Sequence, residues 1–447
     1  LEGKLADDWT AAWNRWLAAR YRTRDALVKA LGEVAEGQDP AAGSVPMPRR
    51  LDDSPQGIQL SLFLADTERD FFARTRAFLR DELKCRALLT DMNAWTNPLQ
   101  NQMVRAEMDY VDDHFYVDHP QFLEQPWRLP SRCPNTSPVA AGAPGGRHCA
   151  FIRLMDRPFT CTEYNYSAPG RFRGVGGILT GALGSVQDWS GIWRFAYSHN
   201  RGNLFTPGTM NYFDMAGDPL GQASERASLC LFRRGDMKAA PHSVAILLTP
   251  DAVVKAPKSA RGVIPGWTGL ALVTRVGVVI GDGAAKAKGA DLVLPVGEAA
   301  GANVLSVDPY APDAGEKILA EMRSRGWLKA GNPTDASAPC FQSETGELTV
   351  DGPADVMTLD TARTAGGYAP AGKKVETQVA TISMEDTDAT VWVSSVDGQP
   401  IRDSRRLIVT HLTDLQNTGC RYGEKARQTL LSWGGLPHLV RTGRATV

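Results

Sequence analysis

The alternation of helical patterns with short apolar runs over residues 1–235 constrains the fold of this chain most strongly. Helical patterns occupy 5–21, 23–36 and 67–84, with Thr23 and Thr67 as expected N-caps. Apolar runs of strand length occupy 87–93, 110–117, 158–166 and 184–189. Because strands that alternate with helices are typical of a parallel sheet with crossover connections, we predict an α/β fold for this region.

The first predicted helix carries an apolar stripe with three tryptophans, Trp9, Trp13 and Trp16, between Leu5 and Leu17. Such a stripe needs a large apolar surface to pack against. We expect that surface to precede Leu1 or to belong to another molecule, so that the sequence begins inside a domain.

Residues 236–335 are predicted to form a connecting α/β segment, with strands at 240–248, 270–281 and 291–296 and a helix at 313–326. The turn Gly281-Asp282-Gly283 resembles a phosphate loop only superficially, since it lacks the GxGxxG and GK[ST] patterns, and a plain turn is favoured. A nucleotide-dependent α/β enzyme built on 270–300 stays an alternative.

From residue 336 to 447 the pattern changes to short strands separated by turn residues. The strands are expected at 348–350, 356–359, 379–384, 389–395 and 406–413. Short strands at regular spacing with Gly, Asp and Asn turns predict an antiparallel β-sandwich.

The composition excludes several classes of protein. The 447 residues predict two or three domains, and 49 basic against 50 acidic residues leave no electrostatic footprint for nucleic acid or an anionic membrane. No run approaches the roughly 20 apolar residues of a membrane span. The seven cysteines show no zinc-ligand spacing, although a Cys133–Cys149 bridge is possible.

Glu163 is the strongest candidate for a chemical role. It stands near the end of the apolar run 158–166, where a barrel strand delivers side chains to its carboxyl-terminal mouth. A carboxylate in a buried strand is costly unless it is paired or used in chemistry. An ion pair with an arginine at the strand end is the alternative.

His114 and Tyr116 form a second candidate pair. They are two positions apart on the predicted strand 110–117, so their side chains point to one side. A tyrosine hydroxyl that donates to a carboxylate stabilises its charged form. The alternatives are a His/Tyr/Asp cluster that fixes a loop, or a metal site, which the distribution of Asp and His over both strand faces disfavours.

Aromatic residues near the predicted strand ends are candidates for stacking on sugar rings. Trp189 ends the run 184–189, whereas Trp193 is expected to be core. The long Pro/Gly-rich stretch 126–147 contains Trp127 and is expected to form a wall of a cleft.

The order of three motifs, H-x-Y at 114–116, T-E-Y-N at 162–165 and Q-D-W at 187–189, resembles strands 6, 7 and 8 of clan A glycoside hydrolases, with families 5 and 42 nearest. The opening W-N-R-W-L-A-A-R-Y is similar to the helix after strand 4, and the tail resembles the sandwich of those enzymes. The resemblance implies that 1–235 is the C-terminal half of a (β/α)8 TIM barrel, 236–335 completes or connects it, and 336–447 is the β-sandwich.

By this resemblance Glu163 is the catalytic nucleophile, Tyr116 hydrogen-bonds it and His114 faces the substrate. The implied substrate-binding residues are Trp189, Asn93, Trp95, Trp127 and Asn165. The Asn-Glu pair that carries the acid/base of the clan has no counterpart here, since Glu2 lies between Leu1 and Gly3. The acid/base is therefore expected upstream of residue 1.

The sequence thus predicts a retaining hydrolase of β-linked oligosaccharides or polysaccharides that uses no cofactor and no metal. Its partner would be the missing N-terminal half of the barrel, in the same protein or in another chain, and a homo-oligomer is possible. A periplasmic or extracellular location is preferred, because most glycan-degrading relatives are exported. The rival is a non-catalytic carbohydrate-binding protein on a degenerate barrel.

Overall fold

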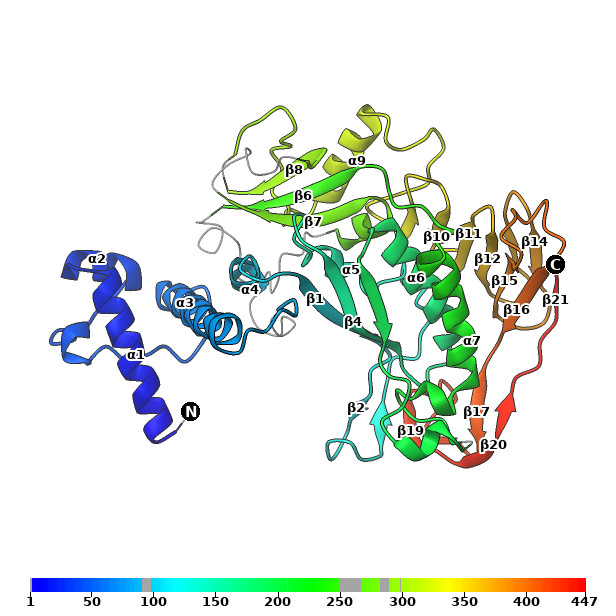
Figure 1. The fold of residues 1–447 in the computed structure, drawn as a ribbon, viewed down its shortest axis with the longest axis horizontal. Coiled ribbons are helices and arrows are strands. Elements are labelled where there is room, and N and C mark those ends of the chain that lie inside the picture. Colours follow the sequence, from blue (N-terminus) through cyan, green and yellow to red (C-terminus); the bar gives the residue numbers. More distant parts are fainter. Residues whose placement is uncertain (1, 91–97, 207, 250–266, 282–288, 298) are drawn as a thin grey trace.

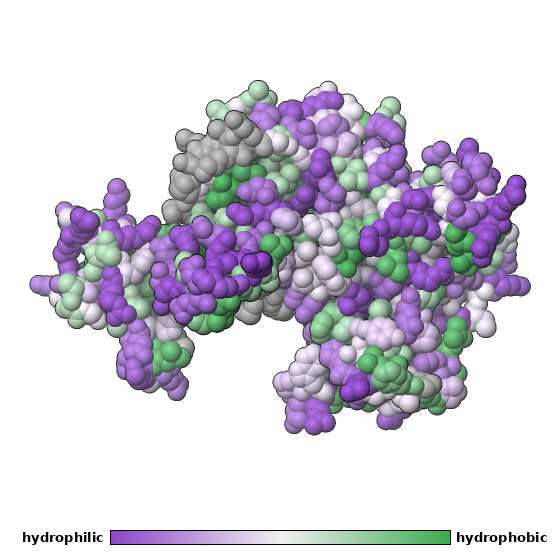
Figure 2. All heavy atoms as spheres, viewed as in Figure 1, coloured by the Kyte–Doolittle hydropathy of each residue, from purple (hydrophilic) through white to green (hydrophobic). Residues whose placement is uncertain are grey.

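A computed structural model describes residues 2–90, 98–206, 208–249, 267–281, 289–297 and 299–447. They form a mixed α/β structure with a β-rich C-terminal part (Figure 1). Among the described helices, none combines the length and the apolar character that a membrane crossing requires. The face shown in Figure 2 is mainly hydrophilic, with separate apolar patches.

α1 (Lys4–Arg20), α2 (Arg24–Leu31) and α3 (Pro55–Ala77) form a helical unit at the N-terminal end (Figure 1, left). Trp13 is fully buried, and the centroid of its ring lies 5.5 Å from that of Phe63 on α3. Trp9 and Trp16 also contact Phe63. The prediction that this stripe packs on residues before Leu1 or on another molecule is wrong, because α3 supplies the surface.

α3 begins earlier than the sequence pattern predicted. Pro55 occupies its first turn and the Ser54 hydroxyl caps it. Thr67, predicted as an N-cap, lies inside the helix, where its hydroxyl donates to the carbonyl four residues earlier. Phe71 on α3 and Phe78 directly after it are 62% and 46% exposed.

β1 (Val111–Val117), β4 (Phe159–Tyr166) and β5 (Gly191–Arg194) form a parallel sheet with β4 in the centre. α6 (Gly176–Val186) leads from β4 to β5, and all of its residues are buried. α7 (Pro219–Ser228) packs on α6. The strands predicted at 110–117 and 158–166 are confirmed to within one residue.

Two other strand predictions are not confirmed. The run 184–189 is not a strand, because α6 continues to Val186 and the strand begins at Gly191. Residues 87–90 are not in a strand, and the rest of the predicted run, with Asn93 and Trp95, lies outside the described residues. Two short helices complete this part, α4 (Pro98–Arg105) and α5 (Arg147–Ala150).

The expected half-barrel of four strands is therefore reduced to three parallel strands within the described residues. β1 and β5 are the outer strands of this sheet, which does not close into a barrel in that part of the chain. The coarser prediction of a parallel α/β unit followed by a β-rich region holds.

A second parallel sheet has the order β7-β6-β8, and α9 (Ala314–Ser324) belongs to the same segment (Figure 1). Its strands are β6 (Ser243–Leu248), β7 (Arg275–Ile280) and β8 (Leu292–Val296). The fully buried Gln187 side chain fixes this sheet to the first one, because its amide donates to the carbonyls of Ala271 and Thr274 and accepts from Val276 N. Of the turn Gly281–Gly283, only Gly281 is described.

The C-terminal region contains a six-stranded antiparallel sheet, β16-β15-β12-β11-β10-β9, a three-stranded sheet, β13-β14-β21, and the pair β17-β20. The strands are β9 (Cys340–Gln342), β10 (Leu348–Asp351), β11 (Val356–Asp360), β12 (Thr364–Ala369), β13 (Lys374–Glu376), β14 (Thr381–Met384), β15 (Ala389–Ser395), β16 (Leu407–Leu412), β17 (Leu415–Thr418), β20 (Gly435–Val440) and β21 (Ala445–Thr446). The sequence pattern did not predict β12. In this strand Gly367 has a φ of 158°, and a side chain does not fit there, because its Cβ would lie 1.8 Å from the Met357 carbonyl oxygen.

A four-stranded sheet crosses the boundary predicted at residue 336. β18 (Arg421–Tyr422) and β19 (Thr429–Ser432) pair with β3 (Ser131–Arg132) and β2 (Gln121–Phe122) in the order β18-β19-β3-β2. This sheet attaches the long loop 126–147 to the C-terminal strands. All seven cysteines are free, so the possible Cys133–Cys149 bridge is not formed.

Candidate active site

A register shift between β1 and β4 shapes the candidate site. His114 pairs with Glu163, whereas Asp113 pairs with Cys161, so Thr162 is an extra residue in β4. Neighbouring side chains of a regular strand point to opposite faces, but a bulge re-aims one of them. Thr162 and Glu163 therefore both reach the His114 ring.

Glu163 accepts a hydrogen bond while it stays open to solvent. The Tyr116 hydroxyl donates to Glu163 Oε2 over 2.5 Å, and His114 Nδ1 lies 3.3 Å from the same oxygen. The Glu163 side chain is 31% exposed. Burial, and then the hydrogen bond to Glu163, raise the pKa of Tyr116 above its usual range, so the phenol is the donor.

A hydrogen-bond network of hydroxyl groups and one buried carboxylate fixes the position of the His114 ring. The Thr162 hydroxyl donates to Asp112 Oδ2 over 2.8 Å, and Thr90 donates to Asp112 Oδ1 over 3.1 Å. Since the only proton of the Thr162 hydroxyl goes to Asp112, its oxygen accepts from His114 Nε2, 2.8 Å away. This network fixes the imidazole so that Nδ1 faces Glu163.

Aromatic rings pack around the Tyr116 ring. The Tyr116 ring contacts Phe195, Phe213 and His119 at centroid distances of 6.3, 5.6 and 5.2 Å. Trp127 is 65% exposed, and its ring centroid lies 6.3 Å from that of Phe213. A flat exposed indole thus continues the aromatic surface that begins at Tyr116.

Three of the predicted site residues, Glu163, Tyr116 and His114, are in direct contact, and Trp127 joins them through Phe213. Asn165 does not fit its predicted substrate contact: it is 1% exposed, and its amide donates to the carbonyls of Phe195 and Phe213. It positions the two aromatic residues instead.

Trp189 does not fit the predicted sugar platform. It is 4% exposed and packs on Phe159, with ring centroids 5.1 Å apart, because it follows a buried helix rather than a strand end. Trp193, expected in the core, is 54% exposed on β5.

The sequence interpretation missed Asp112, Thr162, Phe195 and Phe213. Asp112 had a signal, since the two-residue period of a strand places it on the face of His114 and Tyr116. Thr162 had none, because the bulge that brings it to that face leaves no mark in the sequence. Phe195 and Phe213 are placed by loops after β5.

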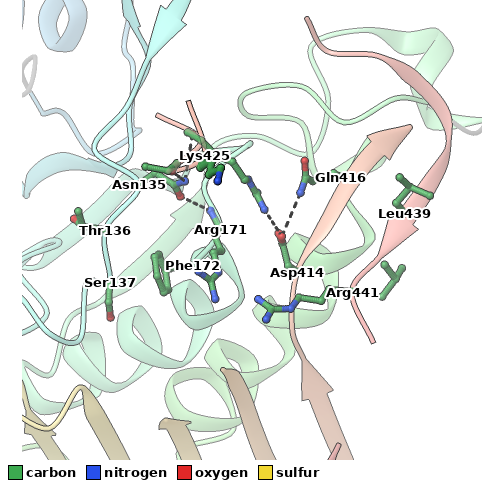
Figure 3. Close-up of a pocket in the computed structure, with 13 residues that line it drawn as sticks. Asn135, Thr136, Ser137, Arg171, Phe172, Asp414, Gln416, Lys425, Leu439 and Arg441 are labelled. Carbon is green, nitrogen blue, oxygen red and sulfur yellow. Dashed lines mark hydrogen bonds and ion pairs between the residues drawn. The ribbon is translucent and has the colours of Figure 1, made fainter. Parts of the chain in front are cut away.

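A separate pocket of about 630 Å³ lies between the loop at 135–137 and the C-terminal strands (Figure 3). Its arginines are paired with carboxylates: Arg427 donates to Asp414 over 2.5 Å, and Arg171 and Arg441 pair with Asp388. None of the residues around Glu163 lines this pocket.

Comparisons with known proteins add little to this geometry. No family model and no curated protein matches the sequence. Among solved structures, the chain is similar to an apo exo-carrageenase GH42 from Bacteroides ovatus, with a TM-score of 0.41 and 10% identity, covering 96% of this chain and 61% of that one. The chain thus spans less than two thirds of the length of that protein, and the assignment of the site rests on Glu163 and its own contacts.

Proposed function

We propose that this chain carries the nucleophile of a retaining glycoside hydrolase that acts on β-linked glycans. The observation that carries the proposal is a partly exposed carboxylate, Glu163, held by a tyrosine hydroxyl and an imidazole at the ends of two parallel strands. A glycosidase nucleophile has to be ionised, oriented and accessible to the anomeric carbon.

Glu163 attacks the anomeric carbon and forms a glycosyl ester, while a second carboxyl group protonates the leaving oxygen. Water then cleaves the ester, and the second group acts as base. The Tyr116 hydroxyl orients the Glu163 carboxylate and stabilises its charge, and the His114 ring, held by Thr162, lies against the same oxygen. No cofactor takes part in these steps.

The second carboxyl group should lie about 5–5.5 Å from Glu163 in a retaining enzyme. Asp112 is unsuited to this role, because it is 7% exposed and each of its oxygens accepts from a threonine. We assign the acid/base to a glutamate outside the described residues, on the strands that would extend the sheet beyond β1 and complete the barrel. Those strands would come from the same protein or from another chain, a second copy included.

Trp127 provides the proposed stacking surface for a sugar ring. Its indole is exposed, and Phe213 connects it to Tyr116, which touches the nucleophile. Flat aromatic faces bury much area at low entropic cost. An oligosaccharide or polysaccharide is therefore the proposed substrate, and an exported location would suit it.

The decisive experiment is hydrolysis of dinitrophenyl glycosides of several β-linked sugars. Their leaving group departs without protonation, so the assay reports the nucleophile even without the acid/base. Glu163→Gln should abolish dinitrophenolate release, while Glu376→Gln, on exposed β13, should leave it unchanged. A deoxyfluoro glycoside should label Glu163 covalently, as mass spectrometry of its peptide would show.

Saccharide binding without turnover or labelling by the wild-type protein would contradict the proposal. That result would favour the second candidate, a non-catalytic carbohydrate-binding protein.

A further inference from the structure

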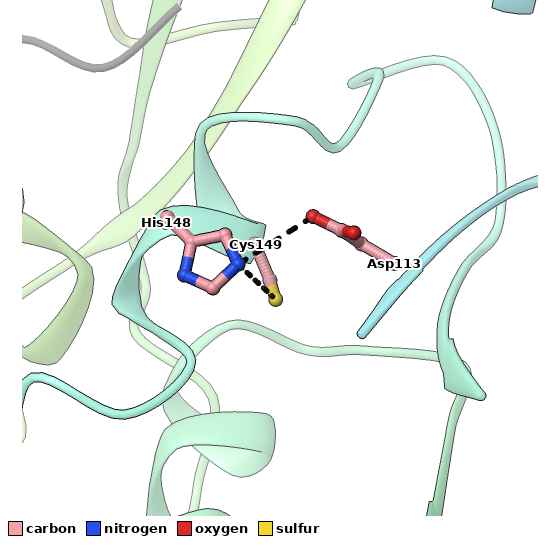
Figure 4. Close-up of side chains that lie close together, drawn as sticks. All are labelled: Asp113, His148 and Cys149. Atoms are coloured by element: carbon pink, nitrogen blue, oxygen red, sulfur yellow. Dashed lines mark hydrogen bonds and ion pairs between the residues drawn. The ribbon is translucent and has the colours of Figure 1, made fainter. Parts of the chain in front are cut away.

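Behind the candidate active site, the reverse face of β1 meets a second group of reactive side chains, Asp113, His148 and Cys149 (Figure 4). His148 Nε2 lies 3.7 Å from Cys149 Sγ and 3.7 Å from Asp113 Oδ2. One ligand atom from each of the three residues lies within 4.8 Å of the other two. Nothing in the proposed hydrolysis uses these residues.

The burial of this group requires an explanation. Cys149 is fully buried and Asp113 is 4% exposed. Asp113 Oδ1 accepts from His114 N over 2.8 Å, but the buried Oδ2 has no hydrogen-bond donor among the described residues. A buried carboxylate oxygen without a donor is costly, and a cation is a usual remedy.

The contact between His148 and Asp113 suits coordination better than hydrogen bonding. Its 3.7 Å separation exceeds a normal hydrogen bond to oxygen, whereas the same separation between His148 Nε2 and Cys149 Sγ is within the range of a hydrogen bond to sulfur. Zinc ligands at about 2.0–2.3 Å in tetrahedral geometry lie roughly 3.5 Å from one another. A carboxylate, an imidazole and a thiolate are a ligand set for a borderline-soft divalent ion.

We propose that Asp113, His148 and Cys149 bind a divalent transition-metal ion, with Zn²⁺ as the expected ion. Water is the expected fourth ligand, since the Cys161 thiol donates to the Glu163 carbonyl oxygen and Cys161 is not one of the three clustered residues. A nucleophilic Cys-His-Asp triad is disfavoured, because a fully buried Cys149 cannot meet a substrate.

The site has an entry path. The His148 side chain is 36% exposed and borders a pocket of about 270 Å³ together with Phe115 and Tyr116. An ion bound here would join β1 to α5, immediately behind His114. This assignment is independent of the proposed hydrolase activity, since it rests on the three side chains alone.

The test uses the full-length protein, stripped of metal with a chelator and titrated with Co²⁺ and then Zn²⁺. One equivalent of Co²⁺ should give a thiolate-to-cobalt charge-transfer band in the near ultraviolet, and Zn²⁺ should remove it. Cys149→Ser should abolish the band and weaken Zn²⁺ binding by at least about 100-fold. His148→Gln, at a half-exposed position, should weaken it similarly, whereas Cys133→Ser, another buried thiol, should not.

If the variants fail to fold, the wild-type protein still decides. Zn²⁺ should raise the unfolding midpoint of the metal-free wild-type protein, because an ion that binds only the folded state stabilises it. Absence of the charge-transfer band, unchanged binding in both ligand variants, or a wild-type unfolding midpoint that Zn²⁺ does not move would overturn the metal site.

Discussion

The two faces of β1 perform different tasks with adjacent residues. On the front face, His114 and Tyr116 converge on a carboxylate that keeps 31% of its side chain exposed. On the back face, Asp113 and Phe115 are almost fully buried, against α5 and Tyr164. The difference teaches that one strand can present solvent-facing chemistry and a packed or metal-binding interior at single-residue spacing. Substitutions on the front face should therefore lower kcat, and substitutions on the back face should lower the free energy of unfolding.

The largest expected effect on the front face is that of Glu163→Gln. The variant should lose at least about 10³-fold in kcat for dinitrophenyl glycosides, as losses of catalytic nucleophiles do in other hydrolases. Its unfolding midpoint should match that of the wild type, because the side chain is partly exposed. If the unfolding midpoint falls together with kcat, Glu163 contributes to the stability of the fold, and the contrast between the two faces of β1 does not hold.

The largest expected effect behind the sheet is that of Trp189→Ala. Deleting this buried indole should reduce the free energy of unfolding by about 3–5 kcal/mol, with kcat per folded molecule unchanged. Trp193→Ala, at an exposed position, should stay within about 0.5 kcal/mol of the wild type. Urea denaturation of both variants measures the contrast, and equal costs would refute the assigned burial.

Tyr116→Phe should have an intermediate effect. A hydrogen bond to a charged group contributes about 1.5–3 kcal/mol, so kcat should fall by about 10–100-fold with little loss of fold. Unchanged kcat would remove Tyr116 from the site.

The pKa of Tyr116 provides a pH test of the same contact. Burial and the neighbouring Glu163 raise this pKa above the ordinary tyrosine value of about 10, so the unfolded chain loses the phenolic proton first as pH rises. The contribution of Tyr116 to stability should thus be complete below pH of about 10 and decline above it. In a spectrophotometric titration, the tyrosinate signal lost in Tyr116→Phe should belong to the region above pH 10. A signal lost below that value would contradict the buried donor.

The smallest expected effect is that of Trp127→Ala. Because the indole is exposed, stability should change by less than about 0.5 kcal/mol. The loss of a stacking surface should raise KM for oligosaccharides by roughly 3–10-fold, with a smaller effect on aryl monosaccharides. An equal effect on both substrate types would place Trp127 away from the distal sugars.

The sequence pattern succeeded where local periodicity determines geometry. The strands 110–117 and 158–166 and the five strands expected after residue 336 were located, although eight other described C-terminal strands were not. The two-residue period placed His114 beside Tyr116. A bulge, a helix packed inside the core and contacts between distant segments leave no such periodic signal.

Three residues illustrate this limit. Trp189 was misplaced because the end of the glycine-rich helix, together with the residues after it, reads as an apolar strand over 184–189, although the helix continues to Val186. Gly177 lets this helix pack closely, since a Cβ there would lie 2.1 Å from the Ser224 carbonyl oxygen. Asp113 and Cys149 are far apart in the sequence, without a recognisable ligand spacing, so only the fold brings them together.

The sheet that joins β3 to β19 has a consequence for how the chain matures. Arg132 and Gln428, which hydrogen-bond across this junction, are 296 positions apart. Contacts between residues so far apart in the sequence form late. During synthesis, the loop that carries Trp127 therefore pairs with its neighbouring strand only after almost the entire chain has emerged. A nascent or C-terminally clipped chain would hold Glu163, Tyr116 and His114 in their sheet but leave the proposed sugar-stacking wall unanchored.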